Sequence, residues 1–276
     1  MDSQIEIRPG RLIHVTLHSN PAAEITLFLI HGLGGRGTQW NALIEQLKPY
    51  YSLVIPDLLG HGRSDKPIPD KNNLYAFHEF DRDLQTLFQR YAGEKNIIIG
   101  HSYGGGLAAS LTIDHQDKIN QLILLGPIPC AAFPSVPFLF HLPSGMMEWM
   151  RPAFEKMFRR LAFSKNADPA LVAGEIEAGR ANPMYVLRAM VSGLKTIAPM
   201  DITMLTVPTT IILSDSDHMV PTIISKAYYK AAPHHQFHRL ANASHMALLE
   251  TPELVNNVII KAITQQCSKA KNHCVA

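Results

Sequence analysis

The chain has 276 residues, of which 46% are hydrophobic and 17% are charged, and its formal net charge is +2. This length and composition are typical of one large globular domain, or of one domain with a sizeable insertion. The weak net charge and the lack of a long basic block argue against a nucleic-acid partner.

The sequence also shows no pattern of export. Residues 1–6 do not combine positive charge with a following apolar run, and no apolar run approaches the roughly 20 residues that span a bilayer. Cys130, Cys267 and Cys274 are an odd number at wide spacing, which fits a reducing compartment better than a disulfide framework. We therefore expect a cytoplasmic protein without a membrane span.

The first half of the chain alternates strand and helix patterns. Residues 5–7 and 12–17 alternate around a Pro-Gly turn, which predicts a hairpin. Buried strands are expected at the apolar runs 25–30, 52–55, 97–100 and 119–126. Helical patterns lie at 40–47, 78–91 and 107–111. This order predicts an α/β fold with parallel strands and right-handed crossovers.

The alternation of strand and helix patterns stops between Pro127 and about Met200, where Pro and Gly residues separate short helical patterns. These patterns cover residues 146–162, 170–178 and 185–194. A segment of this length is not a loop, so we predict a helical cap (lid) inserted after a core strand, on the ligand-binding side of the sheet. The core then comprises residues 1–126 and 201–276, and the cap residues 127–200.

Strand and helix patterns return after the predicted cap. Strands are expected at residues 209–213 and 236–240, and helices at 221–232 and 252–265. Residues 267–276 have the composition of a frayed tail.

A Gly-x-Ser-x-Gly turn, Gly100-His101-Ser102-Tyr103-Gly104, joins the 97–100 strand to the helix that follows it. Such a turn holds the serine in a strained backbone conformation with its hydroxyl exposed. The positive end of the following helix favours negative charge at this place. Ser102 is therefore a candidate nucleophile.

A serine hydroxyl needs a base, and the base needs an acidic residue that fixes its tautomer. His245 follows the last predicted strand, and both Asp215 and Asp217 follow the strand before it. All of these positions lie in loops after strands. The order Ser, Asp, His along the chain is that of the α/β-hydrolase arrangement.

The chain resembles the α/β-hydrolase superfamily over nearly its whole length, in the manner of capped carboxylesterases and meta-cleavage-product hydrolases. The segments that carry the resemblance are His31 to Gly35 with Trp40, Asp57 to Ser64, Gly100 to Gly105, and Ser244 to Met246 with Glu250 to Glu253. It implies a mostly parallel central sheet with helices on both faces.

The resemblance also implies site roles. Ser102 would be the nucleophile and His245 the general base and then the acid. Asp217 would be the orienting acid, because the family places an Asp four residues before the Pro of a Val-Pro pair; Asp215 is the alternative. Ser214 stands where the family usually has Gly.

An oxyanion hole is implied at the backbone N–H groups of Leu33 and Tyr103. We expect Leu33, Gly34, Phe138 and Trp149 to bind substrate, since the cap supplies a large apolar surface that divides between core and channel. The three cysteines form no Cys-x-x-Cys pattern, and we expect no metal and no cofactor.

Residues 151–165 hold five positive side chains and one negative one, and Lys156, Arg159 and Arg160 fall on one helix face. This face is either an ordinary solvated surface or a docking face for an acidic acyl carrier, such as an acyl carrier protein or the phosphates of coenzyme A.

These features predict a serine hydrolase that cleaves a small-molecule carboxylic ester or thioester with an apolar part through an acyl-enzyme on Ser102. Alternatives in the same class are an acyl-carrier methyl ester esterase and a carbon–carbon hydrolase of a vinylogous diketone, for which Arg188 and Lys195 are candidate carboxylate contacts. A ligand receptor built on a hydrolase scaffold is the non-enzymatic alternative.

Overall fold

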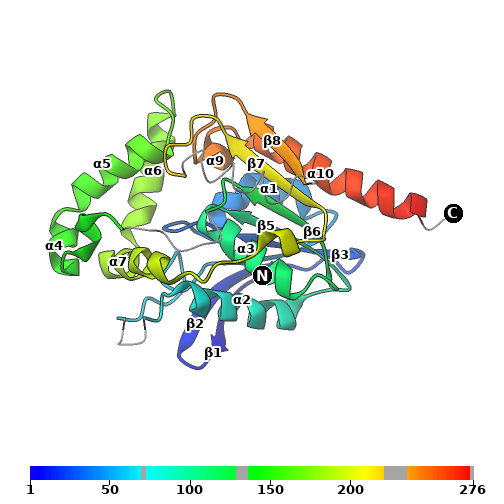
Figure 1. Cartoon of the computed structure of the whole chain (residues 1–276), viewed down its shortest axis with the longest axis horizontal. Helices are drawn as coiled ribbons and strands as arrows, with labels where there is room; N and C mark the ends of the chain where they lie inside the picture. Colours follow the sequence, from blue (N-terminus) through cyan, green and yellow to red (C-terminus); the bar gives the residue numbers. More distant parts are fainter. Residues whose placement is uncertain (70–72, 129–135, 221–234, 274–276) are drawn as a thin grey trace.

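The sheet runs through the middle of the molecule. The computed structural model describes residues 1–69, 73–128, 136–220 and 235–273, and within them eight strands form one sheet in the order β1-β2-β4-β3-β5-β6-β7-β8 (Figure 1). The strands are β1 (Asp2–Arg8), β2 (Arg11–His18), β3 (Ile25–Ile30), β4 (Ser52–Pro56), β5 (Lys95–His101), β6 (Ile119–Leu125), β7 (Thr209–Ser214) and β8 (Gln236–Leu240).

The sheet is antiparallel only at one side. β1 and β2 form the predicted hairpin, β2 pairs with β4 in antiparallel fashion, and the pairs from β4 to β8 are parallel. Ile30 lies opposite Gly100, and His101 lies opposite Leu125. The carboxyl ends of β3, β5 and β6 therefore meet at one edge, where the candidate site residues follow them. The eight-stranded, mostly parallel sheet has the architecture expected from the sequence.

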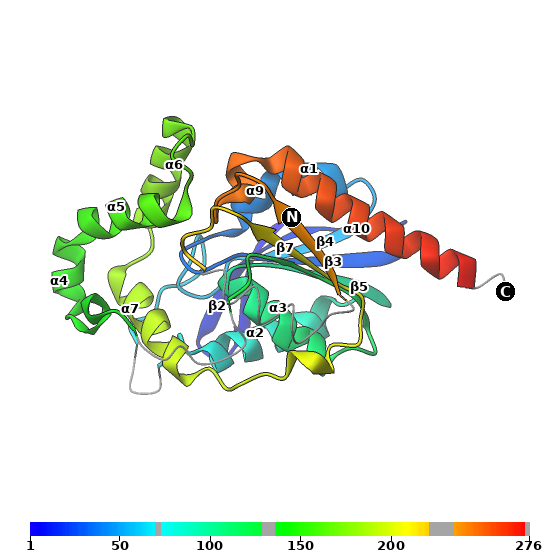
Figure 2. The same ribbon diagram turned by 45° about the horizontal axis from the view of Figure 1, so that its top comes forward.

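Helices cover both faces of the sheet because its central strands are apolar on both sides. Figure 2 shows α1, α9 and α10 over one face and α2 and α3 over the other. In β3, Leu27 and Leu29 pack with α1 and α10, whereas Phe28 and Ile30 pack with α2 and α3. The bounds are η1 (Gly37–Trp40), α1 (Asn41–Leu47), α2 (Phe77–Tyr91), α3 (Tyr103–Asp114), α9 (Ala247–Glu250) and α10 (Pro252–His273).

The segment between β6 and β7 is helical, as the sequence predicts. It contains η2 (Phe138–His141), α4 (Ser144–Trp149), α5 (Arg151–Ala162), α6 (Pro169–Arg180), α7 (Met184–Gly193), η3 (Leu194–Thr196) and η4 (Ile202–Met204). Helices α4 to α7 gather at one end of the sheet (Figure 1) and have a small apolar cluster of their own, which includes Phe140, Met147 and Phe154. We call α4 to α7 and η2 the cap.

Two expected elements differ in the structure, and a third lies outside the described residues. The helix expected at 146–162 is two helices that meet at Met150, because Pro152 lies in the first turn of α5 and cannot donate to a preceding turn. The expected tail is helical up to His273, in a stretch that contains no Gly or Pro. The helix expected at 221–232 lies outside the described residues.

In the described part of the chain, we find no helix with both the length and the apolar character that crossing a membrane requires.

A buried ion-pair cluster fixes the hairpin to α2. The Arg11 guanidinium donates to both carboxylate oxygens of Asp83, with its Nε 2.7 Å from Oδ1, and Arg8 Nε lies 2.8 Å from the same oxygen. Asp83 and Arg11 are both buried. A charge left unpaired in such a place is costly, because the folded protein does not replace its lost hydration.

We expect Asp83→Ala to lower the free energy of unfolding by about 3–5 kcal/mol, since it leaves the buried Arg11 without its partner. Urea denaturation followed by circular dichroism measures the change. The matched control is Glu24→Ala, which breaks an exposed pair with Lys95 and should cost less than about 1 kcal/mol. Equal losses in the two variants would contradict the importance of the buried pair.

Candidate active site

Ser102 lies on a strained turn between β5 and α3. Its φ of 54° and ψ of −117° lie in a backbone region that residues with a side chain rarely adopt. The turn is held in place because the Ser102 N–H donates to the Leu125 carbonyl at 2.9 Å, while the Ser102 carbonyl accepts from the N–H of Ile128 at 3.1 Å. The conformation is thus imposed by the sheet edge.

The two glycines that flank Ser102 allow other backbone segments to approach. A Cβ built on Gly104 would lie 2.4 Å from the carbonyl oxygens of Ile30 and His31, and one built on Gly100 would lie 2.4 Å from the Gly104 carbonyl. Real Cβ atoms do not come so close to an oxygen. The Gly-x-Ser-x-Gly pattern therefore reflects the packing of α3 against the end of β3.

The loop after β3 lies directly beside the serine. A Cβ on Gly32 would be 3.0 Å from the Cβ of Ser102. Within the described residues, the backbone N–H groups of Leu33 and Tyr103 form no hydrogen bond, so both are free to donate to a ligand. Next to Leu33, the Gly34 N–H donates to Nε2 of His61 at 2.9 Å, which fixes the loop.

His245 and Asp217 form a buried pair. Nδ1 of His245 lies 2.7 Å from Oδ2 of Asp217, and Oδ1 of Asp217 accepts the N–H groups of Met219 and Val220, each at 2.8 Å. Burial alone would raise the pKa of Asp217, but the hydrogen bond from His245, its charge and the two backbone donors outweigh burial and lower it. Asp217 is therefore a carboxylate, which keeps a proton on Nδ1 and leaves Nε2 as the basic nitrogen.

Asp215, the other candidate acid, lies elsewhere. Its carboxylate pairs with Arg239 on β8, with Oδ1 2.7 Å from Nη2 of the arginine, and both side chains are exposed. Within the described residues, no hydrogen bond or ion pair joins it to His245. The geometry therefore favours Asp217 over Asp215 as the partner of the imidazole.

Ser102 and His245 line the same cavity. No hydrogen bond joins the Ser102 hydroxyl to the imidazole of His245 in the described residues. The neighbouring His101 fixes the backbone of His245, because its Nε2 lies 3.0 Å from the His245 carbonyl and the two rings are 4.9 Å apart.

Three buried histidines of the motif loops are neutral. Burial lowers the pKa of His61 to about 3, with repulsion from His31 adding to the effect, and burial also lowers the pKa of His101 to about 3 and that of His31. His31 and His61 each accept a backbone N–H at Nε2, from Leu58 and Gly34 respectively. An imidazolium cannot accept these bonds, so the loops require the neutral form.

The cavity has a volume of about 420 Å³ and lies between the sheet edge and the cap. Leu33, Gly34, Ser102, Tyr103 and His245 line it from the core. Its apolar lining from the cap and the loops includes Phe140, Phe154, Met157, Phe158, Leu161, Ile176, Met184, Leu187, Val191 and Leu194. A cavity of this size and character suits a largely apolar ligand.

Phe138 and Trp149 do not line this cavity, contrary to the expectation that they bind substrate. Their side chains are 77% and 83% exposed. Met147 is the inward residue of α4, and a step of two residues turns a side chain by about 200° around a helix, so Trp149 points outward. Phe140 takes the inward place in η2 for the same reason.

Two cap residues with no sequence signal tie the cap to the loop after β3. Glu175 of α6 accepts from both terminal nitrogens of Arg36, at 3.0 and 2.5 Å, and from Gln39 at 2.9 Å. Asn182 donates from Nδ2 to the Gly34 carbonyl at 3.0 Å. Both line the cavity. They are far from the motifs in sequence, so only the fold reveals them.

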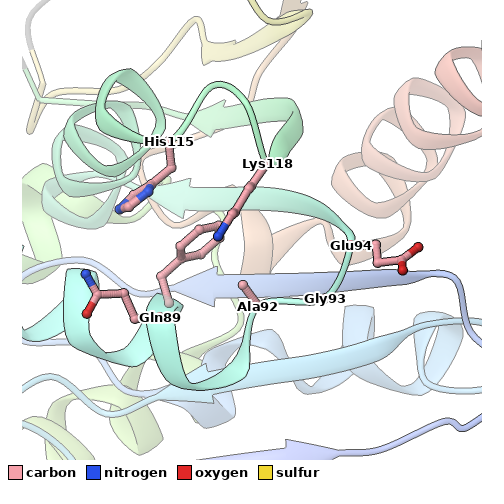
Figure 3. A pocket seen from close by; sticks show the side chains of 7 residues that line it. Gln89, Ala92, Gly93, Glu94, His115 and Lys118 are labelled. Carbon is pink, nitrogen blue, oxygen red and sulfur yellow. The ribbon is translucent and has the colours of Figure 1, made fainter.

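A second hollow lies at the opposite end of the strands, between the ends of α2 and α3 (Figure 3). Gly93 and Glu94 line it just before β5 begins, whereas Ser102 follows the end of β5. The imidazole of His115 in this hollow forms a hydrogen bond with the side chain of Gln85 and packs on the ring of Phe88. In the described residues, neither this hollow nor any other place gathers three His, Cys, Asp or Glu side chains able to hold a metal ion.

Comparisons with known proteins show the family and the fold. Residues 27–258 match the sequence model of the alpha/beta hydrolase family. Human Protein ABHD8 is 30% identical over 275 residues, which cover 91% of this chain and 59% of that protein. The chain thus spans about six tenths of the length of these curated relatives.

Solved structures show the same fold. An esterase (EaEST) from Exiguobacterium antarcticum has a TM-score of 0.84 at 18% identity, over 96% of this chain and 100% of that chain. A bromoperoxidase from Bacillus anthracis has a TM-score of 0.81 at 18% identity, with the same coverage. At these identities the likeness concerns the fold alone.

The buried neutral histidines predict a stability that falls on acidification. An unfolded imidazole takes up its proton near pH 6.5, whereas His61 and His101 in the fold do so only near pH 3, so the unfolded state binds more protons below pH 6.5. Acidification from pH 7 to pH 5 is therefore expected to lower the free energy of unfolding by about 2 kcal/mol for each of these two histidines. Urea titrations across this range measure the fall. In the His61→Asn variant, the loss of unfolding free energy between pH 7 and pH 5 should be smaller by the contribution of one histidine. An unchanged loss in that variant would contradict a neutral, buried His61 in the fold.

Proposed function

The chain belongs to the α/β hydrolase family, and we propose that within it the protein is a serine hydrolase that cleaves a carboxylic ester or thioester with an apolar moiety. One observation carries the proposal. A serine on a strained turn and a histidine bound to a buried carboxylate line a single apolar cavity. Serine nucleophiles are activated by this combination of groups.

In the acylation step, Ser102 Oγ attacks the carbonyl carbon of the ester while Nε2 of His245 takes the hydroxyl proton. Negative charge moves onto the carbonyl oxygen, where the free N–H groups of Leu33 and Tyr103 would stabilise it. The tetrahedral intermediate then collapses. The bond to the alcohol or thiol breaks, and His245 returns the proton to the leaving group. Asp217 stabilises the imidazolium in between.

In the deacylation step, His245 takes a proton from a water molecule, and the resulting hydroxide attacks the acyl carbon. The ester bond to Ser102 breaks, the serine oxygen regains the proton, and the carboxylic acid leaves. No cofactor or metal enters this scheme.

The lining of the cavity supports an apolar acyl or alcohol part. Phenylalanine, methionine and leucine side chains from α5 and α7 line the same cavity as Ser102. Burying an apolar chain against them yields about 25 cal/mol for each Å² removed from water. Glu175 and Asn182 supply a polar border near the loop after β3.

The carbon–carbon hydrolase is less well supported. Such a reaction on a diketone acid needs a cation in the cavity for the second carboxylate. Arg188 and Lys195, the candidates from the sequence, are exposed and do not belong to the lining. Arg151 does line the cavity, but its guanidinium is bound to Glu148.

We expect Ser102→Ala to lower the turnover of p-nitrophenyl butyrate on the order of 10⁴-fold or more, because the variant has no nucleophile. Stability should change little, since the side chain fills almost no volume. A fluorophosphonate probe should label the wild type and leave the variant unlabelled. Turnover well above background in the variant would reassign the nucleophile. If neither protein is labelled and neither turns over esters, the receptor alternative gains support.

We expect Asp217→Asn to lower kcat on the order of 10⁴-fold, since the amide no longer holds the proton on Nδ1 of His245. Asp215→Asn is the matched control, two residues away, and should leave kcat within about twofold because its partner is an exposed arginine. Steady-state kinetics with one short ester measures both. If Asp215→Asn were the more damaging change, the acid would have to be reassigned.

A further inference from the structure

The outside of the cap combines large exposed apolar side chains with cations. We call it the outer cap face, and it comprises Phe138, Met146, Trp149, Lys156, Arg159 and Arg160. Each is exposed, including Met146 at 49%. Large aromatic side chains in water are uncommon when several gather on neighbouring elements, and such patches mark interaction sites.

The aromatic and basic residues lie outside the apolar cluster that α4 and α5 share. Met147 of α4 and Phe154 of α5 are both buried in this cluster. Trp149 of α4 and Lys156 of α5 are both exposed. Arg160 follows Lys156 by one turn of α5. Figures 1 and 2 both show α4 and the start of α5 at the end of the molecule opposite the tip of α10.

The acidic residues of the cap already form ion pairs or hydrogen bonds within the protein. Glu148 pairs with Arg151, Glu155 and Glu177 with Arg180, and Glu175 with Arg36, while Asp168 accepts the first free N–H of α6. In contrast, Lys156, Arg159 and Arg160 form no ion pair within the described residues.

A further cation lies beside Phe138. The ring of Phe138 stacks on His141 with centroids 6.4 Å apart, and Nζ of Lys195 lies 3.1 Å from Nε2 of His141. Lys195 therefore lies near Phe138 through His141, and α5, the helix that follows Trp149, carries Lys156, Arg159 and Arg160.

We propose that the outer cap face binds the surface of an anionic lipid bilayer. Trp149 and Phe138 would enter the headgroup region, where aromatic rings are stabilised, and the lysine and arginine side chains would contact anionic headgroups. An acidic carrier protein matches the charges equally well. The exposed aromatic and methionine side chains favour the lipid surface, since the gain there comes from burying apolar area together with charge attraction. This binding does not depend on the catalytic assignment.

The chain offers an intrinsic reporter for the test. It has two tryptophans, of which Trp40 is buried in the core and Trp149 is exposed. The full chain is mixed with phosphatidylcholine vesicles that contain about one third phosphatidylserine, and with vesicles of phosphatidylcholine alone. We expect a blue shift of the tryptophan emission and quenching by brominated lipid only with the anionic vesicles, both weakened by salt.

Variants locate the binding face. Reversal of Lys156, Arg159 and Arg160 to glutamate should lower the vesicle partition coefficient by at least about tenfold, and Trp149→Ala by severalfold, as measured by flotation. The matched control reverses Arg82, Lys95 and Lys118, which are exposed on the core, and changes the net charge equally. It should lower the partition coefficient by less than about twofold. Circular dichroism confirms that each variant is folded.

Three outcomes would overturn the proposal. They are the absence of binding to anionic vesicles at low salt, an equal loss in the control variant, and binding without a shift or quenching of Trp149. If the protein does not bind vesicles but binds an acyl carrier protein in a charge-dependent manner, this face would be assigned to a carrier instead.

Discussion

The site depends on one steric constraint, the close approach of backbone segments at the end of β5. Gly104 lies against the carbonyl groups of Ile30 and His31, and Gly100 lies against Gly104 itself. The loop after β3 can therefore lie directly beside the serine turn, where Ser102 has a positive φ. The N–H groups of Leu33 and Tyr103 then come to flank the serine without partners in the described residues. The proposed chemistry therefore begins with packing that only glycine permits.

Buried polar side chains also hold the backbone of the site loops in place. His31 and His61 hold the backbone of the two motif loops through neutral imidazoles, and His101 holds the backbone of His245. Asp217 receives three hydrogen bonds that keep it ionised in a buried place. Preorganised groups of this kind need not rearrange during a reaction, which is the main physical source of electrostatic stabilisation in enzymes.

Much of this arrangement could be predicted from the sequence, because the information is local. Apolar runs define buried strands, and the edge of a parallel sheet gathers the loops that follow them, so Ser102, His245 and the two aspartates Asp215 and Asp217 could be placed at this edge without coordinates. The preference for Asp217 over Asp215 comes from the family resemblance. The inward side of the cap could not be selected. Phe138 and Phe140 differ by two positions in one apolar stretch, and only packing against Met147 and Phe154 determines which one faces the cavity. Glu175 and Asn182 belong to no motif at all.

The tie between Arg36 and Glu175 has a consequence for how the cavity is filled. The carboxylate of Glu175 is nearly buried, and it bridges the cap to the loop that carries Leu33. Lifting α6 away from the core would separate two charges in a shielded place, where dissolved ions screen attraction only weakly. Any movement of α6 away from the core would therefore have to break this ion pair, and added salt would weaken the pair only slightly.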